Sequence, residues 1–263
     1  MKQTMINNTA QPPLSPVIKI ALFMTVFISG SVVMVIELLG TRLIAPFYGT
    51  SLYVWSSLIS VTMIALALGY FIGGRWSDSA KRTGLSFIIA VAALFTLFIP
   101  WLTRPVLLAT DSLGLRSGAF VSAFILFLPS LMMLGMVGPF AIKQSTSALD
   151  NIGNASGTIY AISTLGSVIG TLMLGLYLFP LIGSREILIG ASVLLFVLAI
   201  AIGIIERKYL PATSVIWPSI ILVVIGLGML PSVVKAGQIR PNDKFQVHFA
   251  QESLYGWVRV IHQ

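Results

Sequence analysis

Glu37 and Arg42 are the charged residues of a stretch that links the first long apolar run of the chain to the second. An ionisable group within a membrane span is costly to bury, so it is by default a candidate for function. Glu37 could hold a cationic ligand. The first run ends two residues after Glu37, so the helix could instead stop before Arg42. Glu37 would then form a structural clamp with Arg42. Thr41, one helical turn from Glu37, is a closer candidate for a hydrogen bond. Both interpretations are open from the sequence.

Other reactive groups are scarce. The chain has no cysteine, which excludes disulfides, thiolate metal sites and a cysteine nucleophile. Its histidines are His248 and His262, both in the C-terminal tail, so no metal site is predicted. No glycine-rich nucleotide loop and no Ser–His–Asp set can be found. The sequence therefore predicts no catalytic residue and no cofactor held by this chain.

The composition indicates which elements must position Glu37. The chain is 57% hydrophobic and 9% charged, whereas soluble domains carry roughly 25% charged residues. Apolar runs of ~20 residues match a ~30 Å hydrocarbon core. The sequence thus predicts an all-α, polytopic transmembrane bundle of about seven spans. The predicted spans are 17–39, 53–74, 85–108, 118–142, 156–179, 186–205 and 214–234.

Small residues recur at helical spacing in two of these spans. Ala65, Gly69 and Gly73 follow one another every four residues in the second, and Gly166 and Gly170 do so in the fifth. Such faces let helix backbones approach closely where lipid supplies no hydrophobic drive. Tight packing is therefore predicted at both faces, and a substrate path beside the glycines is the alternative.

The fifth span also begins with polar residues, in the stretch Asn154–Gly166. Tyr160 and Thr164 share one helix face there, because they are four residues apart. This face could form a binding surface, or it could supply hydrogen bonds between helices.

The net charge of +8 is scattered between the apolar runs and not clustered on one face, so topology explains it better than nucleic-acid binding. Eight Lys and Arg residues belong to the N-terminus and the loops after the second, fourth and sixth runs, and four belong to the opposite loops. This bias predicts a cytoplasmic N-terminus, and seven spans would place the tail outside. The eight are Lys2, Lys19, Arg75, Lys81, Arg82, Lys143, Arg207 and Lys208, and the four are Arg42, Arg104, Arg116 and Arg185.

The character of the chain changes at both ends of the apolar region. Residues 1–16 read as a flexible lead, 17–234 as the transmembrane domain, and 235–263 as the start of an extramembrane β domain. Phe245–Phe249 and Tyr255–Ile261 alternate with a strand period, and Gln251–Ser253 interrupts it. A lone two-stranded hairpin is marginally stable, so we expect this chain to be part of a longer or split protein.

Three stretches together resemble the membrane-spanning spermidine synthases, which are polyamine aminopropyltransferases with an N-terminal multi-pass domain. The first stretch is Glu37–Ser57. The second is Asn154–Gly183, with its closing Phe-Pro-Leu-Ile-Gly. The third is Glu252–Val260, which is similar to the first strand of the synthase domain. Their order in the chain also fits this family.

The resemblance implies transfer of an aminopropyl group from decarboxylated S-adenosylmethionine, as co-substrate, to putrescine. The nucleotide site and the acidic catalytic residues of the family belong to the synthase domain, beyond these residues. Within this chain the resemblance adds Tyr255 to Glu37 and Arg42 as candidate substrate-binding residues, although Gly256 follows Tyr255 where the soluble enzymes have glutamine. The partners it implies are the lipid bilayer and putrescine or another polyamine, with a homo-oligomer as one arrangement and no nucleic acid. The location it implies is a bacterial inner membrane.

A transporter-like protein for a small cationic solute is the alternative, with the spans themselves carrying the function. Gly74–Asp78, followed by Lys81 and Arg82, partly matches a loop of the major-facilitator transporters. The match is weak, and an ordinary positively charged cytoplasmic loop explains it better. The cytosolic co-substrate of a synthase also conflicts with a tail on the outer side. From the sequence, the substrate and the side of the tail therefore stay open.

Overall fold

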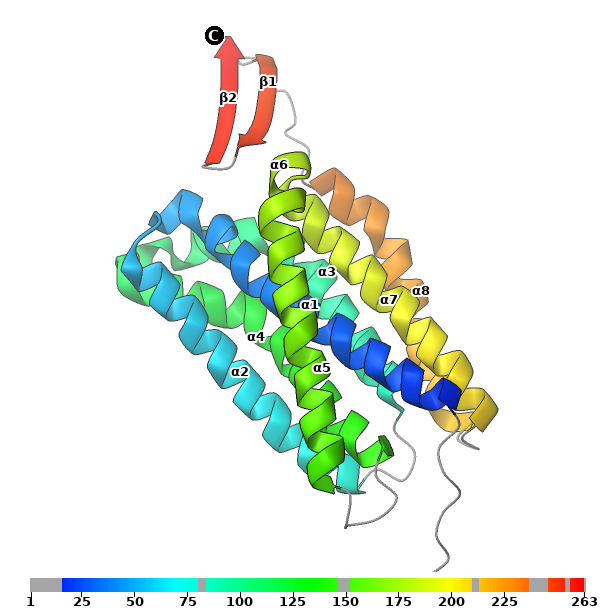
Figure 1. Ribbon diagram of the computed structural model, residues 1–263. Helices are drawn as coiled ribbons and strands as arrows, with labels where there is room; N and C mark the ends of the chain where they lie inside the picture. Colours follow the sequence, from blue (N-terminus) through cyan, green and yellow to red (C-terminus); the bar gives the residue numbers. More distant parts are fainter. Residues whose placement is uncertain are drawn as a thin grey trace, which may run out of the picture.

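The computed structural model describes residues 16–79, 84–145, 152–209, 213–236, 246–253 and 256–262 (Figure 1). These ranges include the short turns at 49–51 and 182–183. Long helices make up nearly all of it. They are α1 (Pro16–Tyr48), α2 (Leu52–Ser79), α3 (Leu85–Thr110), α4 (Gly114–Ser145), α5 (Ile152–Met173), α7 (Ser184–Tyr209) and α8 (Thr213–Ala236). The short pieces are the 3-10 turn η1 (Asp111–Leu113), the π-helical segment η3 (Leu174–Leu178) and α6 (Phe179–Leu181).

In the described part of the chain, five helical segments are long and apolar enough to cross a membrane. They are Pro16–Tyr48, Leu52–Asp78, Leu85–Ser145, Gly153–Leu181 and Ser184–Arg207. The predicted count of about seven spans is not supported, for two reasons. The third segment holds both α3 and α4, because η1 joins them without a break, and the apolar stretch of α8, Pro218–Val233, is shorter. The all-α, membrane-protein character of the chain is as predicted.

The small-residue face of α2 packs directly against α4. Ala65 is fully buried, and a Cβ added at Gly69 would clash with the carbonyl oxygen of Met132. A Cβ at Gly73 would lie 2.8 Å from the Cα of Met136. At Gly69 and Gly73 only glycine allows the two backbones to approach this closely, so the predicted tight packing is confirmed.

The second small-residue face joins α5 to α1. A Cβ at Gly166 would clash with the α1 backbone, and one at Gly170 would lie 2.9 Å from the Cα of Ser31. The close approach permits two hydrogen bonds between the helices. The Ser31 hydroxyl donates to the Gly166 carbonyl at 2.6 Å, and the Ser167 hydroxyl donates to the Gly30 carbonyl at 3.0 Å. Here too the predicted packing is confirmed.

Buried Glu206 ties the end of α7 to the beginning of α3. Its carboxylate accepts hydrogen bonds from the backbone N–H of Leu85 at 2.6 Å and from the Ser86 hydroxyl at 2.5 Å. A carboxylate at a helix N-terminus satisfies free N–H groups and complements the helix dipole. Gly84 precedes the helix, and a Cβ there would clash with the Glu206 carboxylate. The cap of α3 therefore comes from a distant helix.

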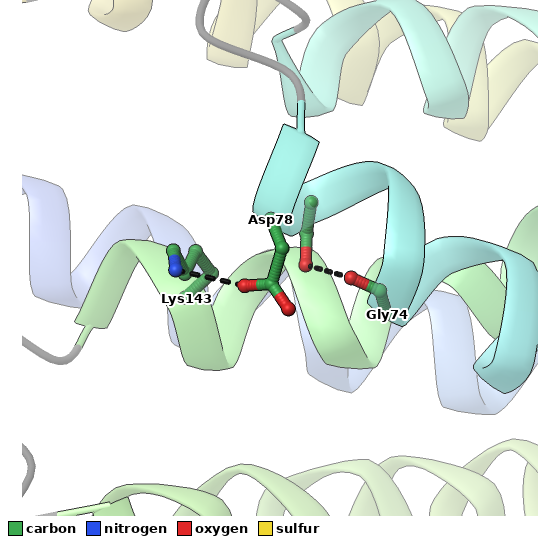
Figure 2. Close-up of polar contacts among 4 residues, drawn as sticks. Gly74, Asp78 and Lys143 are labelled. Carbon is green, nitrogen blue, oxygen red and sulfur yellow. Dashed lines mark hydrogen bonds and ion pairs between the residues drawn. The ribbon is translucent and has the colours of Figure 1, made fainter.

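An exposed ion pair joins the C-terminal end of α2 to the C-terminal end of α4. The Lys143 ammonium lies 2.8 Å from the Asp78 carboxylate (Figure 2). The Ser77 hydroxyl donates to the Gly74 carbonyl at 2.8 Å within α2. Because both charged side chains are more than half exposed, this pair contributes little to stability. Asp78 thus acts here as a surface contact.

Two antiparallel strands follow the helices, β1 (Gln246–Ser253) and β2 (Gly256–His262). Their register runs from Gln246 opposite His262 to Ser253 opposite Gly256, with one irregularity near Val247. The predicted interruption at Gln251–Ser253 is wrong, because backbone pairing continues to Ser253 whatever the pattern of polar residues. Figure 1 places the pair at the end of the molecule where α8 finishes, opposite the first turn of α1.

Candidate functional site

A cavity of about 220 Å³ lies between α1, α2, α4 and α5. It is several times larger than the ~30 Å³ that one water molecule occupies and smaller than the ~300–1,000 Å³ of drug-sized sites. A small or narrow molecule would therefore fit. The lining residues are Val26, Ser29, Gly30, Val33, Met34, Glu37, Thr62, Met63, Leu66, Tyr70, Leu134, Gly135, Gly138, Ile159, Tyr160, Ser163, Thr164 and Ser167.

Helical spacing explains why these side chains share one cavity. On α5, Tyr160, Ser163, Thr164 and Ser167 are separated by three or four residues and so occupy a single face. The lining residues of α1 follow the same period as far as Glu37. The predicted common face of Tyr160 and Thr164 is confirmed, and this face borders the cavity.

Glu37 is the charged residue among the described residues that line this cavity, and no Lys or Arg lines it. The polar neighbours are hydroxyl groups, including those of Thr62, Tyr70 and Tyr160. The site therefore combines one carboxylate with hydroxyl groups that can donate or accept hydrogen bonds. This arrangement favours a positively charged ligand over an anion.

Several of these polar groups have no hydrogen-bond partner among the residues described. They include the half-buried Glu37 carboxylate and the phenols of Tyr70 and Tyr160. By contrast, the Thr164 hydroxyl donates to the Tyr160 carbonyl at 2.9 Å, within its own helix. Polar groups within membrane helices are normally satisfied. Such unsatisfied groups around one cavity therefore indicate a place for a polar ligand.

The site lies near the middle of the bundle. Glu37 is eleven residues before the end of α1, which is ~16 Å along a helix. Tyr70 is nine residues before the end of α2, and Tyr160 is eight residues after the start of α5, which correspond to ~14 Å and ~12 Å. All three groups thus lie inside their helices, ~12–16 Å from the nearer helix end.

The predicted helix end between Glu37 and Arg42 is wrong. α1 continues through both residues to Tyr48, and the Thr41 hydroxyl donates to the Leu38 carbonyl at 2.7 Å. The Gly49 N–H donates to the Ala45 carbonyl at 2.8 Å, and Gly49 ends the helix at a φ of 71°. Glu37 is therefore an interior residue of a long helix, and the helix-end clamp loses its basis.

Arg42 lies away from the cavity that Glu37 lines. Its guanidinium is 3.7 Å from the centre of the Phe179 ring, in cation–π geometry. Phe179 is the last residue of the fifth predicted span and the first of the Phe-Pro-Leu-Ile-Gly segment. The contact thus joins two stretches that carry the family resemblance. The third candidate residue, Tyr255, lies outside the described residues.

Sequence reasoning missed two residues that the structure makes important. Glu206 comes one residue after the predicted 186–205 span, so its burial was not foreseen. Tyr70 lies beside the small-residue face of α2 and lines the cavity. A phenol inside the predicted 53–74 span, next to a face of small residues, is the signal that could have found it.

Family models, curated proteins and solved structures were each compared with the chain, and none matches it. The function is therefore argued from the site itself.

Proposed function

We propose that this chain is a membrane module that binds an organic amine at Glu37 and anchors an aminopropyltransferase domain beginning at β1 and β2. Putrescine or another polyamine is the first candidate ligand. The observation that carries the amine site is the Glu37 carboxylate, which has no partner and no cationic neighbour in the cavity among the described residues. The transferase part is supported by the family resemblance of the three stretches.

An ammonium group suits this cavity chemically. It carries three donors and no acceptor, and it would meet the carboxylate of Glu37 and the phenol oxygens of Tyr70 and Tyr160. Tyrosine rings also attract cations through their faces. A charged group within a membrane requires such a partner, so Glu37 and an ammonium would each satisfy the other.

We further propose that α3, α4 and α8 each cross the membrane, which gives seven crossings in a bacterial inner membrane. The strands would then lie on the side opposite the first turn of α1. The charge bias places that first turn in the cytoplasm, whereas decarboxylated S-adenosylmethionine is a cytosolic co-substrate. The transferase assignment therefore requires the strand side to be cytoplasmic, whereas the charge bias places that side outside. Labelling of the tail decides between these two orientations.

Binding and turnover test the proposal separately. Isothermal titration of putrescine and spermidine into the purified chain in nanodiscs should show binding that Glu37→Gln weakens about tenfold or more. Asp78→Asn removes an exposed carboxylate elsewhere and is the matched control. The chain 1–263 should show no aminopropyl transfer, whereas a chain extended beyond Gln263 should. Turnover by chain 1–263 alone would contradict the anchoring role.

A transporter for a small cationic solute is the second candidate. The position of Glu37 in the interior of α1 favours it, because ionisable groups within membrane helices mark the pathways of ions and substrates. Proteoliposomes containing the chain would then take up a labelled amine. Glu37→Gln would abolish uptake while Asp78→Asn would leave it unchanged. Equal uptake by empty vesicles would exclude this function.

A further inference from the structure

The cavity at Glu37 has an exposed mouth. Met63 is 61% exposed, Tyr70 is 43% exposed and Tyr160 is 46% exposed, and all three line the cavity. The first two belong to α2 and the third to α5. Because these positions belong to helices long and apolar enough to cross a membrane, the surface around them would face lipid. The mouth therefore opens sideways into the bilayer.

The packing of the helices agrees with a lateral opening. α2 packs mainly on α4, and α5 packs mainly on α1, so the two helices that flank the mouth are not packed on each other. Most of the apolar stretch of α5 is exposed. Leu165 and Val168, beside the lining residues of α5, are 58% and 50% exposed. An apolar chain leaving the cavity would thus meet apolar side chains and lipid.

The number of charges in the cavity limits what can bind. Glu37 offers one carboxylate, so it can partner one ammonium group. A second ammonium, as in a diamine, would lie among the described residues of the apolar bundle without an anion in the cavity lining, which is costly. A phospholipid amine would bring a phosphate into a cavity with no cationic lining. A single ammonium on an apolar tail avoids both costs.

We infer that the ligand of this cavity is a membrane-borne primary amine with a single aliphatic chain, which enters from the bilayer between α2 and α5. This inference rests on the proposed amine site and specifies its ligand. The ammonium binds Glu37, and the chain passes Met63 and Leu66 toward the lipid. An alkyl amine then binds more tightly than the water-soluble polyamines, whose weaker binding also depends on Glu37.

Three probes separate these possibilities. The chain in nanodiscs is equilibrated with dodecylamine, dodecanol or putrescine at equal concentrations, and bound molecules are counted by native mass spectrometry. Dodecylamine should bind, and dodecanol, which lacks the charge, should not. Glu37→Gln should reduce dodecylamine binding about tenfold or more. The substitution is nearly isosteric, so it should leave the fold intact.

A plug at the mouth tests the route. Thr164 is exposed and lines the cavity, so Thr164→Trp should fill the opening and reduce dodecylamine binding. Met63→Trp should do the same from the α2 side. The control is Leu165→Trp, which adds the same ring next to Thr164 but outside the lining. It should leave binding unchanged.

The outcomes distinguish this inference from the function on which it rests. Putrescine bound as tightly as dodecylamine, with Thr164→Trp without effect, would overturn lateral binding and leave the amine site standing. Dodecylamine bound equally by wild type and Glu37→Gln would overturn both. Dodecylamine bound more tightly than putrescine, with both weakened in Glu37→Gln, would support the inference.

Discussion

Gly166→Ala tests whether the close contact between α1 and α5 holds the binding cavity together. The added Cβ would overlap the carbonyl oxygen of Phe27 and lie 2.9 Å from the carbon of the same carbonyl. These are backbone atoms, so no side-chain rotation can relieve the overlap. α5 must therefore move away from α1, and the cavity that both helices line must widen.

The size of the effect follows from what the separation disturbs. Overpacking of this kind costs roughly 1–3 kcal/mol. The hydrogen bonds from Ser31 to Gly166 and from Ser167 to Gly30 lengthen, and bonds between membrane helices average about 0.6 kcal/mol each. The better helix propensity of alanine returns about 0.8–1 kcal/mol. The net loss in the free energy of unfolding is roughly 1–3 kcal/mol.

The assay is unfolding in mixed micelles with increasing denaturing detergent, followed by amine binding in nanodiscs. Gly157→Ala is the matched control, because it lies in the same helix and its added Cβ would meet nothing within 4 Å. Gly157→Ala should be as stable as wild type or more stable, by up to about 1 kcal/mol. If Gly166→Ala were as stable as Gly157→Ala and bound amine equally well, the reasoning from close contact would be refuted.

Four further predictions concern single residues. Glu206→Ala should lower the free energy of unfolding by roughly 2–4 kcal/mol, because buried donors at the start of α3 lose their acceptor; an unchanged unfolding midpoint would contradict the cap. Asp78→Asn should change stability by less than about 1 kcal/mol, since the ion pair with Lys143 is exposed; the same unfolding assay measures it. Glu37→Gln should raise stability while weakening amine binding, because it replaces a carboxylate that has no partner among the described residues of an apolar bundle; a loss of stability would mean that Glu37 is structurally paired. Ser112→Cys, in a chain without other cysteines, follows Thr110, which contacts the end of α1, so it lies on the strand side of the bundle. It should react with an impermeant thiol reagent only after lysis, because the transferase assignment requires this side to be cytoplasmic; labelling from outside intact cells would contradict that assignment.

Close helix packing was predictable because it depends on local spacing. Gly166 and Gly170 recur at helical period, and so do Ala65, Gly69 and Gly73. A face of small residues is a property of one helix, whichever helix it meets. The partner helices were not predictable, because nothing in the spacing of α5 specifies α1 over α4.

The boundaries of α1 show where local reasoning failed. The apolar pattern ends at Leu39, yet α1 continues to Tyr48 with Pro46 inside it. Ile44 and Tyr48 are buried in the core, and the Tyr48 phenol donates to the Thr110 hydroxyl at 3.0 Å. These contacts with other helices keep the last turns helical. They also convert Glu37 from a residue near a helix end into an interior one.

The sequence by itself determined the class of this protein, because composition and helical periodicity are local and the bilayer selects for both. It also singled out Glu37, since a carboxylate in an apolar run is costly wherever the run packs. Only the tertiary structure decided that Glu37 shares a cavity with Tyr70 and Tyr160 while Arg42 faces Phe179. A site assembled from four helices depends on their rotation and depth relative to one another, and the close contacts between helices set both.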